Sequence, residues 1–146
     1  MGTQQVLLIV ISVIIVGAAV AVGINMFDTQ ANNNARNAVV SDIIQMGIQA
    51  QAWFRTPIMM GGGGGRFFDT DMQKLLGYLD TKWADPSITD YTTINGSFTF
   101  THRAGNNLLV VGTSNQNPEI VISGLVYLLG GSPADNYGIL ISSGAP

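Results

Sequence analysis

The first 27 residues of this chain contain no charged side chain, and the first ionisable side chain is that of Asp28. Positions 6–24 are almost unbroken aliphatic sequence, interrupted only by Ser12 and by small residues. A helix of about 20 apolar residues is long enough to cross the hydrocarbon core of a bilayer. Burying the thirteen large aliphatic side chains of this run contributes roughly 20–40 kcal/mol. Because a domain's net stability is only about 5–15 kcal/mol, the segment requires either lipid or the core of an assembly.

The composition favours a surface that packs against copies of itself. Only 10% of the residues are charged, with six Lys and Arg against nine Asp and Glu, whereas an average domain carries about 25%. The net charge of −3 argues against a nucleic-acid partner, which rewards clustered basic residues. The chain has no cysteine, which excludes disulfides and cysteine-based metal sites. Residues 1–5 lack the Lys or Arg of a secretory signal peptide.

Apolar residues continue at helical spacing beyond the aliphatic run, and no proline occurs before Pro57. This spacing predicts one helix from near residue 2 to near residue 54, apolar all round in its first half and amphipathic in its second. The residue before a proline is disfavoured in a helix, so Thr56-Pro57 is predicted to end it. The stripe expected to pack on the rest of the domain is Ala35, Val39, Ile43, Met46, Ala50 and Trp53.

The second half of the chain carries strand and turn signals. Asn95-Gly96 between two β-type runs predicts a hairpin with a type I′ turn. Gly124 is expected to mark a bulge or a close backbone approach. The predicted strands lie at 91–94, 97–101, 107–111, 119–129 and 137–142. They are expected to form an antiparallel meander of four or five strands.

The predicted fold class is therefore α+β, a long N-terminal helix packed on a small antiparallel β-meander. Residues 1–27 form a hydrophobic helix half for a membrane or filament core, and residues 28–146 form a globular head. The head comprises an amphipathic helix half at 28–54, a glycine-rich loop at 57–68, a short helix at 69–79 and the sheet at 91–146. The short helix is expected to be capped by Asp69 or Thr70 and to point Met72, Leu75, Leu76 and Leu79 inward.

No residue pattern in this chain indicates catalysis, a cofactor or a metal. The run Gly61–Gly65 is followed by Arg66-Phe67-Phe68 rather than by the Lys and Ser/Thr of a phosphate-binding loop, so we expect a surface loop. His102 is expected on a sheet face, and no calcium-binding spacing surrounds Asp69 and Asp71. Asp80, Asp85 and Asp90 are interpreted as solvated turn residues. Asn95-Gly96-Ser97 also fits an N-glycosylation acceptor, although the turn interpretation is favoured.

The whole arrangement resembles a type IV pilin. The residues that carry the resemblance are Gln4–Ile11, the segment 17–23 and the amphipathic segment 31–53. The resemblance implies that a dedicated peptidase removes a leader ahead of Met1, whose new amine is then methylated. It also implies pilus assembly machinery and a precursor held in the inner membrane. The likeness covers the whole architecture but is residue-specific only in the first 54 or so positions.

The chain departs from the family pattern at three places. Gln5 stands where the family usually has a Glu that pairs with a neighbour's N-terminal amine. Val22 stands where many members have a helix-breaking proline, and many members also have a C-terminal disulfide that this chain lacks. Gly17 and Gly23 weaken a helix by roughly 1 kcal/mol each, against about 3 kcal/mol for an interior proline. We therefore expect the helix to stay intact, or nearly so, between them.

These observations predict a non-enzymatic structural subunit of a cell-surface or extracellular filament, a helical homopolymer of identical chains joined through the N-terminal helix. Two alternatives are a pseudopilin of a type II secretion-like machine and a single-pass membrane-anchored adhesin or binding domain. The resemblance leaves the filament's role open among adhesion, twitching motility, DNA uptake and electron transfer. The expected assembly residues are Met1, Gln4, Gln5, Val6, Leu7, Leu8, Ile9, Val10, Ile11, Ile14, Ile15, Gly17 and Gly23.

Overall fold

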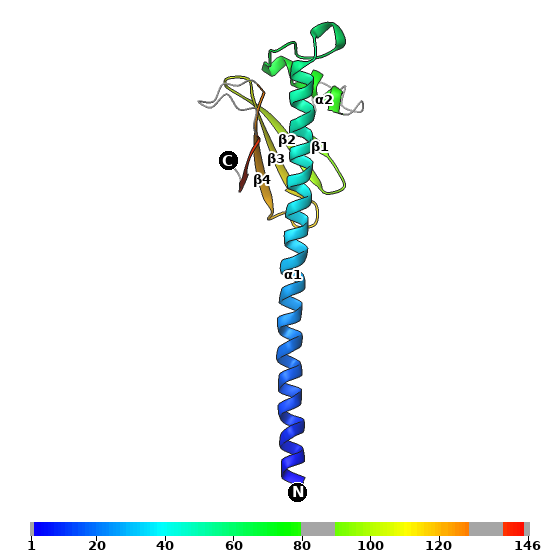
Figure 1. The fold of residues 1–146 in the computed structure, drawn as a ribbon, viewed down its shortest axis with the longest axis vertical. Coiled ribbons are helices and arrows are strands. Elements are labelled where there is room, and N and C mark those ends of the chain that lie inside the picture. The colour runs from blue at the N-terminus through cyan, green and yellow to red at the C-terminus, as the bar shows by residue number, and fades with distance from the viewer. Residues whose placement is uncertain (1, 80–89, 129–138, 145–146) are drawn as a thin grey trace. The chain divides into compact units, whose positions relative to one another are not determined.

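The computed structural model describes residues 2–79, 90–128 and 139–144 (Figure 1). The first element is the helix α1, which runs without interruption from Gly2 to Arg55 and ends before Pro57, as its sequence predicts. Its hydrogen-bonding pattern is continuous through Gly17 and Gly23, so the single chain has no helix break there. The chain divides into two compact units, Met1–Asn34 and Ala35–Pro146.

The second unit contains a five-stranded sheet in which sequence neighbours are spatial neighbours, in the order β1-β2-β3-β4-β5. All four pairings are antiparallel. The strands are β1 (Asp90–Thr92), β2 (Gly96–Arg103), β3 (Asn107–Ser114), β4 (Val121–Tyr127) and β5 (Ile139–Ser143). The predicted antiparallel meander and the α+β fold class are confirmed. Positions 137–138 of the last predicted strand lie outside the described residues.

The core lies between one face of this sheet and the second half of α1 (Figure 1). Alternate side chains of β2 are buried, as expected for a strand covered on one face. Val39 and Ile43 from the helix contact Gly112 and Gly124 of the sheet. The short helices η2 (Asp69–Asp71) and α2 (Met72–Leu79) add Met72, Leu75 and Leu76 to the same cluster, with Leu79 partly buried against it. The two layers thus share one core.

The β1–β2 hairpin exists, but its turn differs from the predicted one. Neither Asn95 nor Gly96 has the positive φ that a type I′ turn requires. The Thr93 amide instead donates to the Gly96 carbonyl at 2.8 Å, which places Ile94 and Asn95 at the tip. Gly96 is the first residue of β2, where an added Cβ would meet the Thr113 carbonyl oxygen at 2.5 Å. Close strand approach, rather than turn geometry, therefore requires this glycine.

The left-handed pair expected at the first hairpin occurs at the second. Gly105 (φ 82°) and Asn106 (φ 60°) both adopt positive φ in the turn between β2 and β3. Asp90 also differs from its interpretation as a turn residue, because it begins β1 and its carboxylate accepts a hydrogen bond from Thr99 Oγ1 at 2.8 Å. Asp80 and Asp85 lie outside the described residues.

The glycine-rich loop folds back over the end of α1. The amides of Gly63, Gly64 and Gly65 donate to the carbonyls of Trp53, Thr56 and Phe54 at 2.8–3.0 Å. The last carbonyls of a helix have no partner within the helix, and this loop supplies partners for them. A Cβ at Gly62 would collide with the Thr56 carbonyl, so the loop is tightly apposed to the helix end.

Candidate assembly surface

The first unit consists of one helix segment whose large apolar side chains face outward in every direction. Leu8 is 68% exposed and Phe27 is 77% exposed, and even the least exposed large aliphatic, Ile11, is 44% exposed. An apolar face this extensive is abnormal on a soluble monomer and marks a site of contact with protein or lipid. The exposed large hydrophobic residues of this unit are Val6, Leu7, Leu8, Ile9, Val10, Ile11, Val13, Ile14, Ile15, Val16, Val20, Val22, Ile24, Met26 and Phe27.

Two hydroxyl groups of this unit bond to the helix itself. Ser12 Oγ, within the aliphatic run, donates to the carbonyl of Ile9 at 2.7 Å, and Thr29 Oγ1, just beyond the apolar segment, donates to the carbonyl of Asn25 at 2.9 Å. Such back-bonding makes a hydroxyl tolerable where no water is available. The most apolar 18-residue window of α1 has a mean hydropathy of 3.0, and by length and composition this helix is able to cross a membrane. The segment therefore suits a non-aqueous environment.

The predicted assembly residues lie together on this unit, with one exception. Gln4 and Gln5 are exposed at the start of α1, beside the aliphatic residues that follow. Gly17 and Gly23 leave open space where a Cβ would stand, with no described atom within 4 Å. Met1 lies outside the described residues. Val13, Val16, Val20, Val22 and Ile24, which belong to the aliphatic run already singled out from the sequence, lie on the same exposed surface. Met26 and Phe27 extend it beyond that run, and their hydropathy was the available signal.

The head-packing stripe lies at the interface between α1 and the sheet. Trp53 is fully buried, its ring meets Phe67 edge-on at a centroid distance of 6.1 Å, and its Nε1 donates to the Gly61 carbonyl at 3.0 Å. All six stripe residues, Ala35, Val39, Ile43, Met46, Ala50 and Trp53, are buried. Gly47 belongs to the same interface, because Ile139 Cδ1 lies 2.5 Å from the position of an added Cβ. The head thus covers the apolar stripe of the helix, whereas Ile48, outside the stripe, is 58% exposed.

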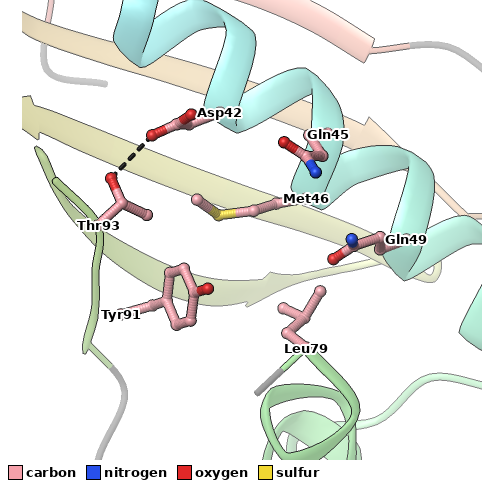
Figure 2. A pocket seen from close by; sticks show the side chains of 7 residues that line it. All are labelled: Asp42, Gln45, Met46, Gln49, Leu79, Tyr91 and Thr93. Atoms are coloured by element: carbon pink, nitrogen blue, oxygen red, sulfur yellow. Dashed lines mark hydrogen bonds between the residues drawn. The ribbon is translucent and has the colours of Figure 1, made fainter. Parts of the chain in front are cut away.

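A small pocket lies between α1, α2 and β1 (Figure 2). Its volume is about 110 Å³, below the roughly 300–1,000 Å³ of sites that bind organic ligands. Asp42 is the one carboxylate among the described residues that line it, and one oxygen of that group accepts hydrogen bonds from Thr93 Oγ1 at 2.8 Å and from Asn95 Nδ2 at 3.1 Å. The lining residues are Asp42, Gln45, Met46, Gln49, Leu79, Tyr91 and Thr93. This carboxylate fixes the β1–β2 turn to α1.

The other residues considered for chemistry have structural surroundings. His102 is half-buried and its ring lies 5.3 Å from that of Phe67. Over residues 2–79, 90–128 and 139–144, no three His, Asp or Glu side chains lie close enough to hold a metal ion. Asp71 accepts a hydrogen bond from the Phe68 amide and forms an ion pair with Lys74 at 3.0 Å. The amides of the glycine run bind helix carbonyls, so they do not form a phosphate cradle.

Asn95 does not present a free amide for glycosylation in the folded head. Its Nδ2 donates to Asp42, its carbonyl accepts from the Asn115 amide at 3.0 Å, and the residue is partly buried. Attachment of a glycan would require this nitrogen to leave the carboxylate. The turn interpretation of Asn95-Gly96-Ser97 therefore describes the residue's role better, although the turn type is different.

Comparisons of the chain with protein-family models, with curated proteins and with solved structures each gave no match. The chain's own geometry, a long N-terminal apolar helix on an antiparallel sheet, is compatible with a pilin-like fold. The same helix is compatible with membrane insertion or with a signal-like segment.

Proposed function

We propose that this chain is the structural subunit of an extracellular type IV pilus-like filament. Identical copies polymerise without covalent bonds through residues 2–27. Before assembly, the precursor is inserted in the inner membrane through the same segment. The observation that carries the proposal is the contrast between the exposed aliphatic residues of the first unit and the complete core of the second. A chain of this kind needs neighbours for its helix, whereas its head already has a core.

The proposed mechanism transfers the first unit from lipid to the equivalent surfaces of other copies. Lipid tails and aliphatic side chains are similarly apolar, so helix association there depends on close packing. Gly17, Ala18, Ala21 and Gly23 are small enough to let helices approach closely. The heads would form the outer layer, and the subunit would have no catalytic role and no cofactor.

Gln5 supplies the polar contact in this mechanism. Gln4 and Gln5 are the long polar side chains at the edge of the apolar run. A buried amide without a partner costs about 1–3 kcal/mol, so Gln5 is expected to bond to the N-terminus or backbone of a neighbouring copy. We expect Gln5→Leu to lower filament yield and Gln5→Glu to be tolerated. Filament yield sheared from cells, quantified on gels against total subunit, measures both, and an unchanged yield from Gln5→Leu would contradict this role.

The decisive experiment is electron cryomicroscopy of material sheared from cells that produce the chain. Micrometre-long filaments built from this subunit, with a core of bundled helices, would support the proposal. Short fibres confined to the cell envelope would instead indicate a pseudopilin of a type II secretion-like machine. A chain that stays in the membrane fraction as a detergent-soluble monomer would indicate an anchored adhesin or binding domain. Either of the last two results would reject the proposed subunit of an extracellular pilus-like filament.

A further inference from the structure

The tip of the β1–β2 turn presents an exposed apolar side chain, that of Ile94, on a turn held by hydrogen bonds. Ile94, at the tip of the β1–β2 turn, is 96% exposed. The turn is tied to α1 through Asp42, and Asn115 Nδ2 donates to the carbonyls of Thr93 and Ile94 at 3.2 and 3.4 Å. Lone exposed apolar residues are common, so Ile94 alone indicates nothing. Its exposure becomes informative because the same unit also has a cavity that an isoleucine side chain fits.

This cavity has a volume of about 450 Å³ and lies beside the glycine-rich loop. Ile58 and Phe68 supply apolar walls that are largely exposed, and Gly61–Gly63 leave the wall between them without side chains. Met59, next to Ile58, is 100% exposed. The loop is held in place by its amides on the α1 carbonyls, so the cavity is part of an anchored structure. It is large enough to receive an isoleucine side chain.

The β1–β2 turn, which carries Ile94, and the glycine-rich loop, which borders the cavity, lie toward opposite ends of the second half of α1 (Figure 1). The turn carrying Ile94 is bound to Asp42, whereas the loop is bound to Trp53 and the residues that follow it. These two attachment points are separated by about 17 Å along α1 at ~1.5 Å per residue. An exposed side chain at one end of a head and a cavity at the other allow a head-to-tail contact between copies. Such a contact extends into a line of copies and does not form a closed dimer.

Among the described residues, the two ends of the head carry a small excess of opposite charge. Arg66, Lys74 and Asp71 line the cavity, and Lys74 pairs with Asp71 at 3.0 Å, so Arg66 supplies the excess positive charge there. Arg103 ends β2 on the same side, where His102 packs against Phe67. At the other end, Asp42 lies beside the turn, and Glu119 is exposed in the loop between β3 and β4, which Asn115 joins to the turn. Arg36 lines the same hollow as Glu119, so the excess negative charge at this end is also small. A nucleic acid or an anionic membrane would match the basic end alone. A second copy of this chain matches both ends.

We infer that Ile94 of one head inserts into the cavity between Ile58 and Phe68 of the next head, with the basic rim facing the acidic end. The inference rests on the proposed function, because a bundled helical core holds all copies parallel and so brings unlike ends together. The contact is a second interface, separate from the aliphatic core. Its role is to join heads along the filament.

Cysteine cross-linking tests this contact because the chain contains no cysteine. Ile94→Cys is combined with Thr70→Cys, an exposed residue lining the cavity, and sheared filaments are treated with a short bis-maleimide. Each chain then carries both partners of the contact, so a ladder of dimers, trimers and longer products is expected on a denaturing gel. The matched control pairs Ile94→Cys with Thr101→Cys, which is exposed on the sheet face opposite α1. Each single variant is expected to give dimers at most.

Every outcome bears on the inference. Filaments in which the Thr70 pair cross-links no further than the Thr101 pair would overturn the contact and leave the proposed function standing. Dimers without longer products would indicate a closed twofold pairing and would also overturn it. Absence of filaments from the unmodified chain would reject the proposed function and this contact together.

A second variant keeps the test independent of cysteine chemistry. Ile94→Asp changes a side chain that is 96% exposed, so the head is expected to fold normally. Filaments are expected to form but to become shorter under a fixed shear, whereas Ile94→Val is expected to keep the original length distribution. An unchanged length distribution for Ile94→Asp would overturn the inference.

Discussion

The two halves of α1 show how one secondary structure serves two environments. In the first half, aliphatic side chains lie on all sides of the helix and remain exposed. In the second half, apolar residues recur every three or four positions, and Val39, Ile43, Ala50 and Trp53 are completely buried under the sheet. A stripe is covered by one neighbouring layer, whereas an all-round apolar surface needs neighbours on every side. The same helix therefore has a covered half, whose apolar stripe is buried within the chain, and an exposed half, whose apolar residues are not.

The largest effect is expected from removing residues 1–27, the exposed half of α1. A chain beginning at Asp28 is expected to be a soluble monomer that forms no filaments, because the aliphatic surface of residues 6–24 is gone. Size-exclusion chromatography and electron microscopy, with the full chain as control, measure the change. Filaments from the shortened chain would show that the apolar half is not the core of the assembly.

The covered half of α1 is tested by replacing Trp53, its largest fully buried side chain. Trp53→Ala is expected to lower the free energy of unfolding by about 3–5 kcal/mol, because it empties the space against Phe67 and removes the bond to Gly61. Ile48→Ala on the same helix is the matched control, since Ile48 is 58% exposed, and it is expected to stay within about 0.5 kcal/mol. Denaturant unfolding followed by circular dichroism gives both values. Equal effects at the two positions would contradict the buried placement of Trp53.

A smaller loss of stability is expected from Asp42, a polar residue at the edge of the covered half. Asp42→Ala removes the acceptor for Thr93 Oγ1 and Asn95 Nδ2, and is expected to cost about 1–3 kcal/mol. Ser41→Ala, an exposed neighbour, is expected to change stability by less than about 0.5 kcal/mol. Amide hydrogen exchange should show faster exchange in the β1–β2 turn of the Asp42 variant alone. Unchanged protection of the Thr93 amide would refute the anchoring role of Asp42.

Glycines in the two halves give the finest comparison, because alanine should act in opposite directions. Gly124→Ala places a methyl group against Ile43 and is expected to destabilise the head by about 1–3 kcal/mol. Gly17→Ala meets no described atom within 4 Å, and is expected to stabilise the isolated helix by up to about 1 kcal/mol. If helices approach closely at Gly17 in a filament, the same change lowers filament yield. Thermal unfolding and filament yield, measured for both variants, would reveal any departure from these signs.

Much of the fold followed from local patterns in the sequence. The extent of α1, its end before Pro57, the short helix near residue 72 and the antiparallel meander were all predicted because periodicity and proline act locally. The Asn95–Gly96 turn was predicted wrongly. The local preference of Asn-Gly for positive φ is outweighed by two tertiary contacts. Asn95 Nδ2 bonds to the Asp42 carboxylate, and Gly96 lies close against the Thr113 carbonyl of the neighbouring strand. Asp90 began a strand instead of a turn through its pairing opposite Thr99.

Hydropathy and helical spacing are properties of neighbouring residues, so they already identify the residues that require an apolar environment. Which of those residues are buried within the chain depends on how its elements pack. That packing covers the stripe from Ala35 to Trp53, folds the glycine-rich loop onto the α1 carbonyls, and leaves Ile94 at one end of the head and the Ile58–Phe68 cavity at the other. These outcomes depend on contacts between residues that are far apart in sequence, such as Asp42 with Asn95 and Ile43 with Gly124, and no local pattern contains them.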